Sequence, residues 1–158
     1  MIRALVIISI VASVNIQALI DSHRWNEAEA QLESLSPKVR PRFVGLIAQG
    51  RGQPAKAAKA FERALAATPA VPQLHLYASH AYLKLQRFKK ALAHAQSAAA
   101  LRDKAIAQPL LEARAFQGLK QDAKAYAVLA RACVTYAKEF RPWLELEALA
   151  QRCQLRHE

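Results

Sequence analysis

The chain has 158 residues, enough for one domain with a sizeable core, and its formal net charge is +11. Alanine is the dominant residue and glycine occurs only four times, so helix propensity is high along almost the whole sequence. Two cysteines, Cys133 and Cys153, exclude a disulfide framework and a zinc site built on Cys-x-x-Cys pairs, and leave open whether the two thiols pair.

Residues 1–21 form an apolar segment with no charge between Arg3 and Asp21. Three interpretations fit this segment. The basic start, the apolar stretch and Ala18 are typical of a cleaved secretory signal, and residues 4–20 are just long enough for a short membrane anchor. Polar residues at every fourth position would also suit the buried first helix of a repeat. We expect a protein associated with the bacterial inner membrane through this segment, with a cytoplasmic or periplasmic location as the alternative.

Residues 22–37 read as the second helix of a degenerate repeat, beginning at Arg24 and Trp25 and continuing through Leu32 and Leu35. Pro37 shortens this helix, because proline disfavours the helical conformation of the residue before it. The interval from this repeat to the next is therefore expected to be five residues shorter than the intervals that follow.

Residues 38–139 repeat themselves with a fixed period, which predicts three 34-residue units at 38–71, 72–105 and 106–139. Three columns carry the period: Ala57, Ala91 and Ala125; Phe61, Ala95 and Leu129; Ala64, Ala98 and Ala132. Small side chains at fixed positions let two helices approach closely, so each unit is expected to be a pair of antiparallel helices. Residues 140–158 are predicted to be a C-terminal capping helix and tail whose polar face includes Glu145 and Glu147.

The pattern resembles the tetratricopeptide-repeat (TPR) family. The matching residues are Ala57, Phe61 and Ala64 followed by Pro69, and Tyr82 with Phe88, Ala91 and Ala98. The resemblance implies an all-α, right-handed superhelical solenoid of antiparallel helix pairs. It also implies a non-enzymatic scaffold or adaptor for protein–protein interaction. The Ala- and Arg-rich composition favours a bacterial source, so we expect an accessory subunit of a larger bacterial complex. A plain helical bundle is the alternative fold.

The first helices of such a solenoid line its concave side, and side chains not used in packing face a partner. The register assigns this partner-binding face to ten residues: Arg42, Leu46, Gln49, Leu76, His80, Leu83, Lys84, Leu110, Arg114 and Gln117. Cations among apolar neighbours suit an acidic or peptide-like protein partner through charge-assisted hydrogen bonds.

Residues 38–141 contain many more Lys and Arg than acidic residues, so the repeats are the basic part of the chain. The cluster Arg87, Lys89 and Lys90 is expected at a helix turn, where it could rest on an anionic lipid surface. The same charge suggests an alternative function, the binding of single-stranded RNA by a helical-repeat protein. Stacking aromatics are scarce on the predicted concave face, so nucleic acid is the less favoured partner.

No motif for catalysis, phosphate binding or metal ligation occurs in the sequence. His75 and His80 lie five residues apart and would point in different directions on a helix, and His94 has no partner at ligand spacing. We expect these to be ordinary packing or surface histidines. No catalytic residue, cofactor or metal is therefore predicted.

Overall fold

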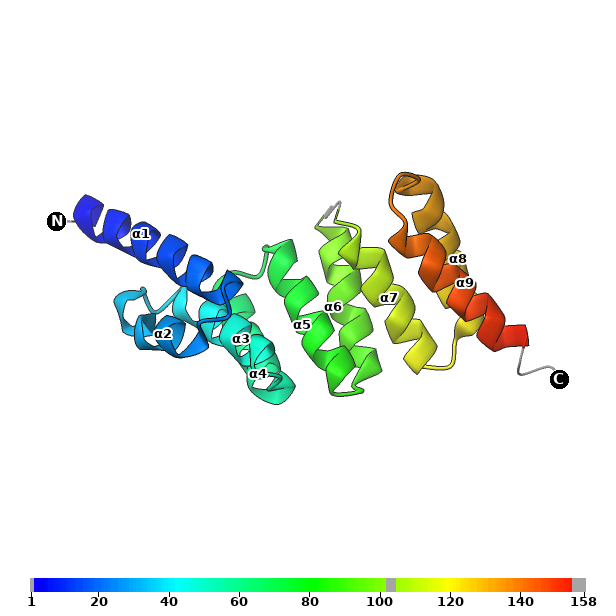
Figure 1. Ribbon diagram of the computed structural model, residues 1–158, viewed down its shortest axis with the longest axis horizontal. Helices are drawn as coiled ribbons and strands as arrows, with labels where there is room; N and C mark the ends of the chain where they lie inside the picture. The colour runs from blue at the N-terminus through cyan, green and yellow to red at the C-terminus, as the bar shows by residue number, and fades with distance from the viewer. Residues whose placement is uncertain (1, 102–104, 155–158) are drawn as a thin grey trace.

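The computed structural model describes residues 2–101 and 105–154. Within them the chain is all-helical, and its helices stack in sequence into an elongated solenoid with the termini at opposite ends (Figure 1). The elements are α1 (Ile2–Asp21), α2 (Trp25–Ala30), the short 3-10 helix η1 (Leu32–Ser34), α3 (Arg40–Gly50), α4 (Pro54–Ala67), α5 (Pro72–Lys84), α6 (Phe88–Ala100), α7 (Ala107–Gly118), α8 (Asp122–Thr135) and α9 (Arg141–Gln154).

Antiparallel pairs make the repeats: α3 with α4, α5 with α6, and α7 with α8, followed by α9 as a further first helix. The alanine columns explain the close packing. Ala57, Ala91 and Ala125 are fully buried, and Phe61 and Leu129 fill the space beside them. The predicted all-α solenoid of antiparallel helix pairs is thereby confirmed.

The turn inside each repeat has the same backbone conformation. His23, Gly52, Gln86 and Lys120 adopt positive φ angles between 56° and 67°, and the following amide bonds back to the fifth residue before it. Gln53 N–H donates to the Ala48 carbonyl at 2.8 Å in this way, which caps the first helix. Only Gly52 adopts this left-handed conformation without steric cost.

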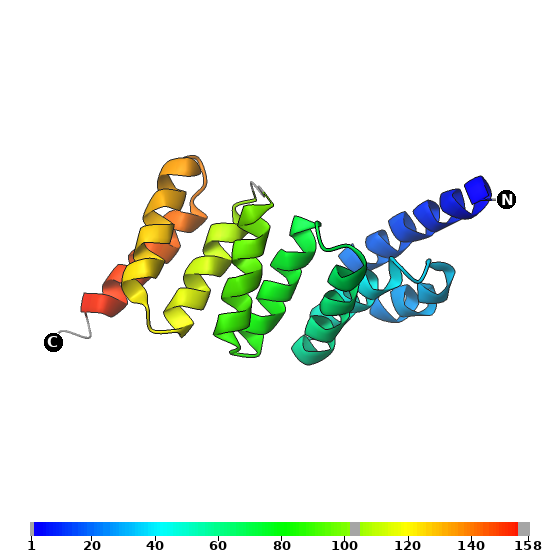
Figure 2. The same ribbon diagram turned by 180° about the vertical axis from the view of Figure 1, so that it is seen from behind.

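These turns lie along one edge of the solenoid, which we call the turn edge. The loops that join one repeat to the next, 68–71 and 136–140 among them, lie along the opposite edge, which we call the loop edge (Figures 1 and 2).

The N-terminal repeat is irregular. The expected second helix over residues 22–37 is a six-residue helix followed by one 3-10 turn, because Leu35 is extended ahead of Pro37. The Arg40 side chain donates to the Leu35 carbonyl at 3.2 Å and closes the break. The last turns of α1 bury Ile16, Leu19 and Ile20 in the core shared with α2 and α3.

No helix in the described part of the chain combines the length and apolar character needed to cross a membrane. The two cysteines are free, with Cys133 buried and Cys153 partly buried. Burial raises the pKa of the Cys133 thiol, which keeps it protonated at neutral pH.

Candidate binding groove

Two adjoining hollows lie on the face formed by the first helices. One is lined by Gln49, Gly52, Pro54, Ala57, His80, Ala81 and Lys84. The other is lined by Gln49, Gln73, Leu76, Tyr77, His80, Ala107, Leu110, Leu111, Arg114 and Arg141. Because Gln49 and His80 belong to both, the hollows form one groove from the α3–α4 turn across α5 and α7 to the start of α9.

The groove includes six of the ten residues predicted from the register: Gln49, Leu76, His80, Lys84, Leu110 and Arg114. The other four do not line it. Arg42 is exposed with its guanidinium 5.6 Å from the Phe43 ring centre, Leu46 is buried in the core, and Leu83 packs partly buried against the core. Gln117 lies on the same helix as Arg114, one turn further along. The first-helix register therefore identifies the helices that form the groove, but not each residue that lines it.

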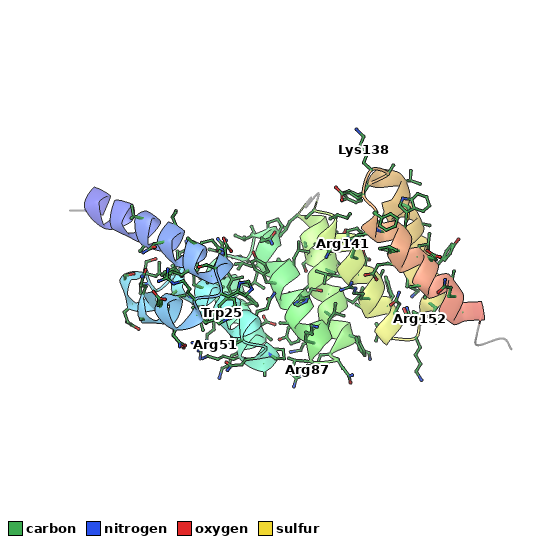
Figure 3. The ribbon with its side chains drawn as sticks, viewed as in Figure 1. Trp25, Arg51, Arg87, Lys138, Arg141 and Arg152 are labelled. Atoms are coloured by element: carbon green, nitrogen blue, oxygen red, sulfur yellow. The ribbon has the colours of Figure 1, made fainter. Side chains whose placement is uncertain are left out.

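The sequence interpretation missed Gln73, Tyr77 and Arg141. A signal for Arg141 was present, because Gln73, Ala107 and Arg141 occupy the same position in successive repeats and so share one column. Tyr77 of α5 stacks on Phe61 of α4 at 5.4 Å between ring centres, so this pair joins two repeats. Figure 3 shows Arg141 where α9 begins, beside the central helices.

Three polar atoms in the last turns of the first helices are buried without a hydrogen-bond partner in the described chain. They are Gln49 Oε1, His80 Nδ1 and Gln117 Nε2; Arg40 Nε, at the start of α3, is a fourth such atom and lies away from the groove. An unpaired buried polar group costs about 1–3 kcal/mol. The side chains of Gln49 and His80 line the groove, so a ligand bound there could supply the missing hydrogen bond once either side chain turns toward it. A carbonyl acceptor, a ring nitrogen and an amide donor together match the groups of a polypeptide backbone.

The charge of the groove is positive. Lys84 and Arg141 form no ion pair with a described carboxylate, whereas Arg114 is bound by Glu145 of α9. Burial, followed by the charges of Lys84 and Arg114, lowers the pKa of His80, so its imidazole is neutral at physiological pH.

Glu145 corrects one prediction. It was expected on the polar outer face of a cap, but α9 packs on α8 with Glu145 facing α7, and its side chain is only 21% exposed. The Glu145 carboxylate therefore forms an ion pair with Arg114, which an acidic partner would otherwise bind.

A second polar cluster lies where α4, α5 and α6 meet. Glu62 Oε1 accepts a hydrogen bond from the Tyr82 hydroxyl at 2.8 Å and contacts His94 Nε2 at 3.2 Å. The Nδ1 atoms of His94 and His75 lie 3.1 Å apart. His94 was expected to be an ordinary packing or surface histidine, and its two hydrogen-bonding neighbours come from helices that sequence spacing alone does not connect.

The proton arrangement of this cluster follows from its contacts. His94 Nε2 donates to Glu62, and His75 Nε2, 3.1 Å from the Pro69 carbonyl oxygen, donates to that oxygen because a carbonyl only accepts. The contact between the two Nδ1 atoms then takes one proton, carried by one of the two rings. Burial lowers the pKa of His94. Despite its own burial, Glu62 has a lowered pKa because it accepts bonds from Tyr82 and His94, and the pKa of Tyr82 is raised to about 12 by burial and by Glu62. Among the described residues, no group of side chains is arranged to hold a metal ion.

The predicted lipid-facing cluster lies on the turn edge. Arg87, Lys89 and Lys90 are exposed, and none forms an ion pair with a described carboxylate. Lys90 Nζ lies 5.2 Å from the centre of the Tyr82 ring.

Solved structures share this architecture. The second TPR domain of human RPAP3, in complex with the HSP70 peptide SGPTIEEVD, matches at 18% identity and TM-score 0.67, covering 72% of this chain and 94% of that one. The first TPR of Spaghetti, bound to the HSP90 peptide SRMEEVD, matches at 20% identity and TM-score 0.67, covering 74% and 95%. MamA MSR-1 matches at 13% identity and TM-score 0.75, covering 92% and 87%.

The chain has the tetratricopeptide-repeat fold. No model of a protein family and no curated protein matches the sequence, so these structural likenesses establish the fold alone. TPR domains of this architecture bind proteins, as the peptide complexes of RPAP3 and Spaghetti illustrate.

Proposed function

We propose that this TPR domain is a non-enzymatic adaptor that holds an acidic, extended peptide segment of a partner protein in the first-helix groove. The observation that carries the proposal is the pair of unpartnered buried atoms Gln49 Oε1 and His80 Nδ1, on side chains that line the groove. Backbone amides and carbonyls of an extended peptide would satisfy both kinds of group, as in other peptide-recognition grooves.

The positive charges of the groove favour a peptide with acidic side chains. Arg141 and Lys84 are available, and Arg114 becomes available when Glu145 is displaced. Charge-assisted hydrogen bonds from Arg or Lys to a carboxylate are about twice as strong as neutral ones. The two TPR domains with bound peptides hold acidic sequences, EEVD at the end of each. That similarity supports the acidic class of ligand rather than a particular partner.

Single-stranded RNA is the alternative anionic ligand. Proteins that bind single-stranded nucleic acid stack its bases on several aromatic side chains. Of the residues that line the groove, Tyr77 is the one such aromatic side chain. We therefore favour the peptide. The sequence-based prediction of an accessory subunit in a larger bacterial, membrane-associated complex stands beside this proposal.

The test is selection from a random octapeptide library displayed on phage, followed by fluorescence anisotropy with the enriched peptide. We expect enrichment of peptides rich in Asp and Glu. Reversing two groove charges, with Arg114→Glu and Arg141→Glu, should weaken binding by about tenfold or more. The matched control reverses two exposed cations of α4 outside the groove, Lys59→Glu and Arg63→Glu, and should bind as the wild type does.

Enrichment of neutral or basic peptides, or equal binding by the groove variant, would overturn the proposal. So would RNA titrations in which a single-stranded oligonucleotide binds tightly with steep salt dependence and competes with the selected peptide.

A further inference from the structure

The large apolar side chains that the described chain leaves exposed are unevenly distributed. Most of them adjoin the loop edge: Leu101, Val134, Phe140, Trp143 and Leu144. Tyr126 lies near the other end of α8, and Val11 and Val14 lie on α1. Solitary exposed apolar residues are ordinary, but a group of them at one place marks an interaction site.

The densest group is at the corner between α8 and α9, and we call it the corner patch: Val134, Phe140, Trp143 and Leu144. Val134 is 79% exposed and Phe140 is 71% exposed, while Trp143 and Leu144 are about half exposed. Phe140, Trp143 and Leu144 are spaced by three and four residues, so they share one side of the first turn of α9. The corner patch therefore keeps two aromatic rings in water at the tip of the solenoid.

Cations lie near the corner patch. Arg131, Lys138 and Arg141 are exposed near it, Arg141 also lining the groove, against two exposed acidic neighbours, Glu139 and Glu147. Figure 3 places Lys138 on the loop-edge side of the molecule, Arg141 beside the central helices, and Arg51 and Arg87 on the turn-edge side. An apolar tip whose exposed neighbours include more cations than carboxylates is complementary to a surface that offers both hydrocarbon and anions.

Two other occupants suit the corner patch less well than such a surface. A helix stacked along α9 would need apolar contacts over several turns, but the exposed face of α9 beyond its first turn carries Glu147, Gln151 and Arg152. A second copy of the chain would bring two sets of these cations together, in a protein whose net charge is already +11.

We propose that the corner patch docks the protein onto an anionic lipid bilayer, with Phe140 and Trp143 inserted among the headgroups and the neighbouring cations on lipid phosphates. Tryptophan suits this position because its ring is apolar while its N–H can stay hydrated. Amphipathic anchoring of this kind gains from both buried apolar area and attraction to anionic lipid. The turn edge, with Arg87, Lys89 and Lys90, then faces away from the membrane, contrary to the sequence-based expectation for those residues.

The experiment measures co-sedimentation of the full chain with phosphatidylcholine vesicles that contain or lack phosphatidylglycerol. We expect binding to the anionic vesicles, weakened by salt. The variant Phe140→Ser with Trp143→Ser should lose at least about tenfold in partition, because each ring gives up its burial in the headgroup region. The matched control, Tyr126→Ser, removes an aromatic side chain that is 51% exposed at the far end of α8, and should bind normally.

Tryptophan fluorescence provides a second readout. In a Trp25→Phe background Trp143 becomes the reporter, and its emission should shift to the blue when anionic vesicles are added. Thermal melts of the serine variant should match those of the wild type because both rings are exposed. Capture of the octapeptide should be unchanged, which separates this proposal from the groove function.

Three results would overturn the proposal. The first is equal sedimentation of the wild type and the serine variant. The second is loss of binding in Arg87→Gln/Lys89→Gln/Lys90→Gln while the serine variant still binds, which would assign the lipid surface to the turn edge. The third is a concentration-dependent dimer that the serine variant abolishes without vesicle binding in either protein, which would assign the patch to a second copy.

Discussion

Gly118→Ala tests how consecutive repeats fit together. A Cβ atom at residue 118 would lie 2.2 Å from Cδ1 of Phe88, the first residue of α6. Ordinary carbon contacts are about 3.5–4.0 Å, so the ring or the helix must retreat by more than about 1 Å. Overpacking of this kind costs about 1–3 kcal/mol, which predicts a loss of several degrees in Tm for a chain of this size.

Urea denaturation followed by circular dichroism, carried out as a double-mutant cycle with Phe88→Ala, would isolate the contact. Removing the ring makes room for the new methyl group, so the double variant should be more stable than the sum of the two single effects by about 1 kcal/mol or more. Additivity within about 0.5 kcal/mol would refute the reasoning.

Gly52→Ala is the control for that cycle. Gly52 has a φ of +67° and nothing within 4 Å of the position of a Cβ atom. Its substitution should cost about 1–2 kcal/mol through backbone strain alone. That cost should not change when Phe88 is replaced.

Three further outcomes are expected. Glu145→Gln should free Arg114 and raise affinity for an acidic peptide by about two- to fivefold, the worth of a partly exposed ion pair; unchanged or weaker anisotropy binding would contradict this. His80 and His94 have pKa values below the unfolded 6.5, so stability should be full above about pH 6.5 and fall as acid protonates them; a rise in the urea midpoint on acidification would be inconsistent with their burial. Lys120→Gly should raise Tm slightly, because glycine adopts its φ of 59° without strain, and a lower Tm would show that the turn tolerates lysine.

The parts of the fold that the sequence predicted are those set by local spacing. Ala57, Ala91 and Ala125 must be small for helices to approach, and that demand recurs once in every repeat, so the repeats could be placed before any coordinates. The same register located the groove-forming helices and six of the residues that line the groove.

The parts that could not be predicted depend on contacts between distant residues. Arg114 and Glu145 pair although they lie 31 residues apart in the sequence, and Glu62 contacts His94, which lies 32 residues away. Neither pairing repeats in another unit, so periodicity carries no information about it. The short α2 was missed because Trp25, Leu32 and Leu35 have helical spacing, although the chain before Pro37 leaves the helix.

The spacing of the turns has a consequence for how this protein can change length. Gly52, Gln86 and Lys120 follow one another at equal intervals, so a whole unit could be duplicated or deleted between them and the flanking helices would still meet in phase. Each such step would lengthen the groove by one first helix and let it accommodate a longer ligand. The interval from His23 to Gly52 is shorter by five residues, and a unit spliced at that joint would be out of phase with both neighbours. The solenoid is therefore extensible at its centre and fixed in length at its N-terminal end.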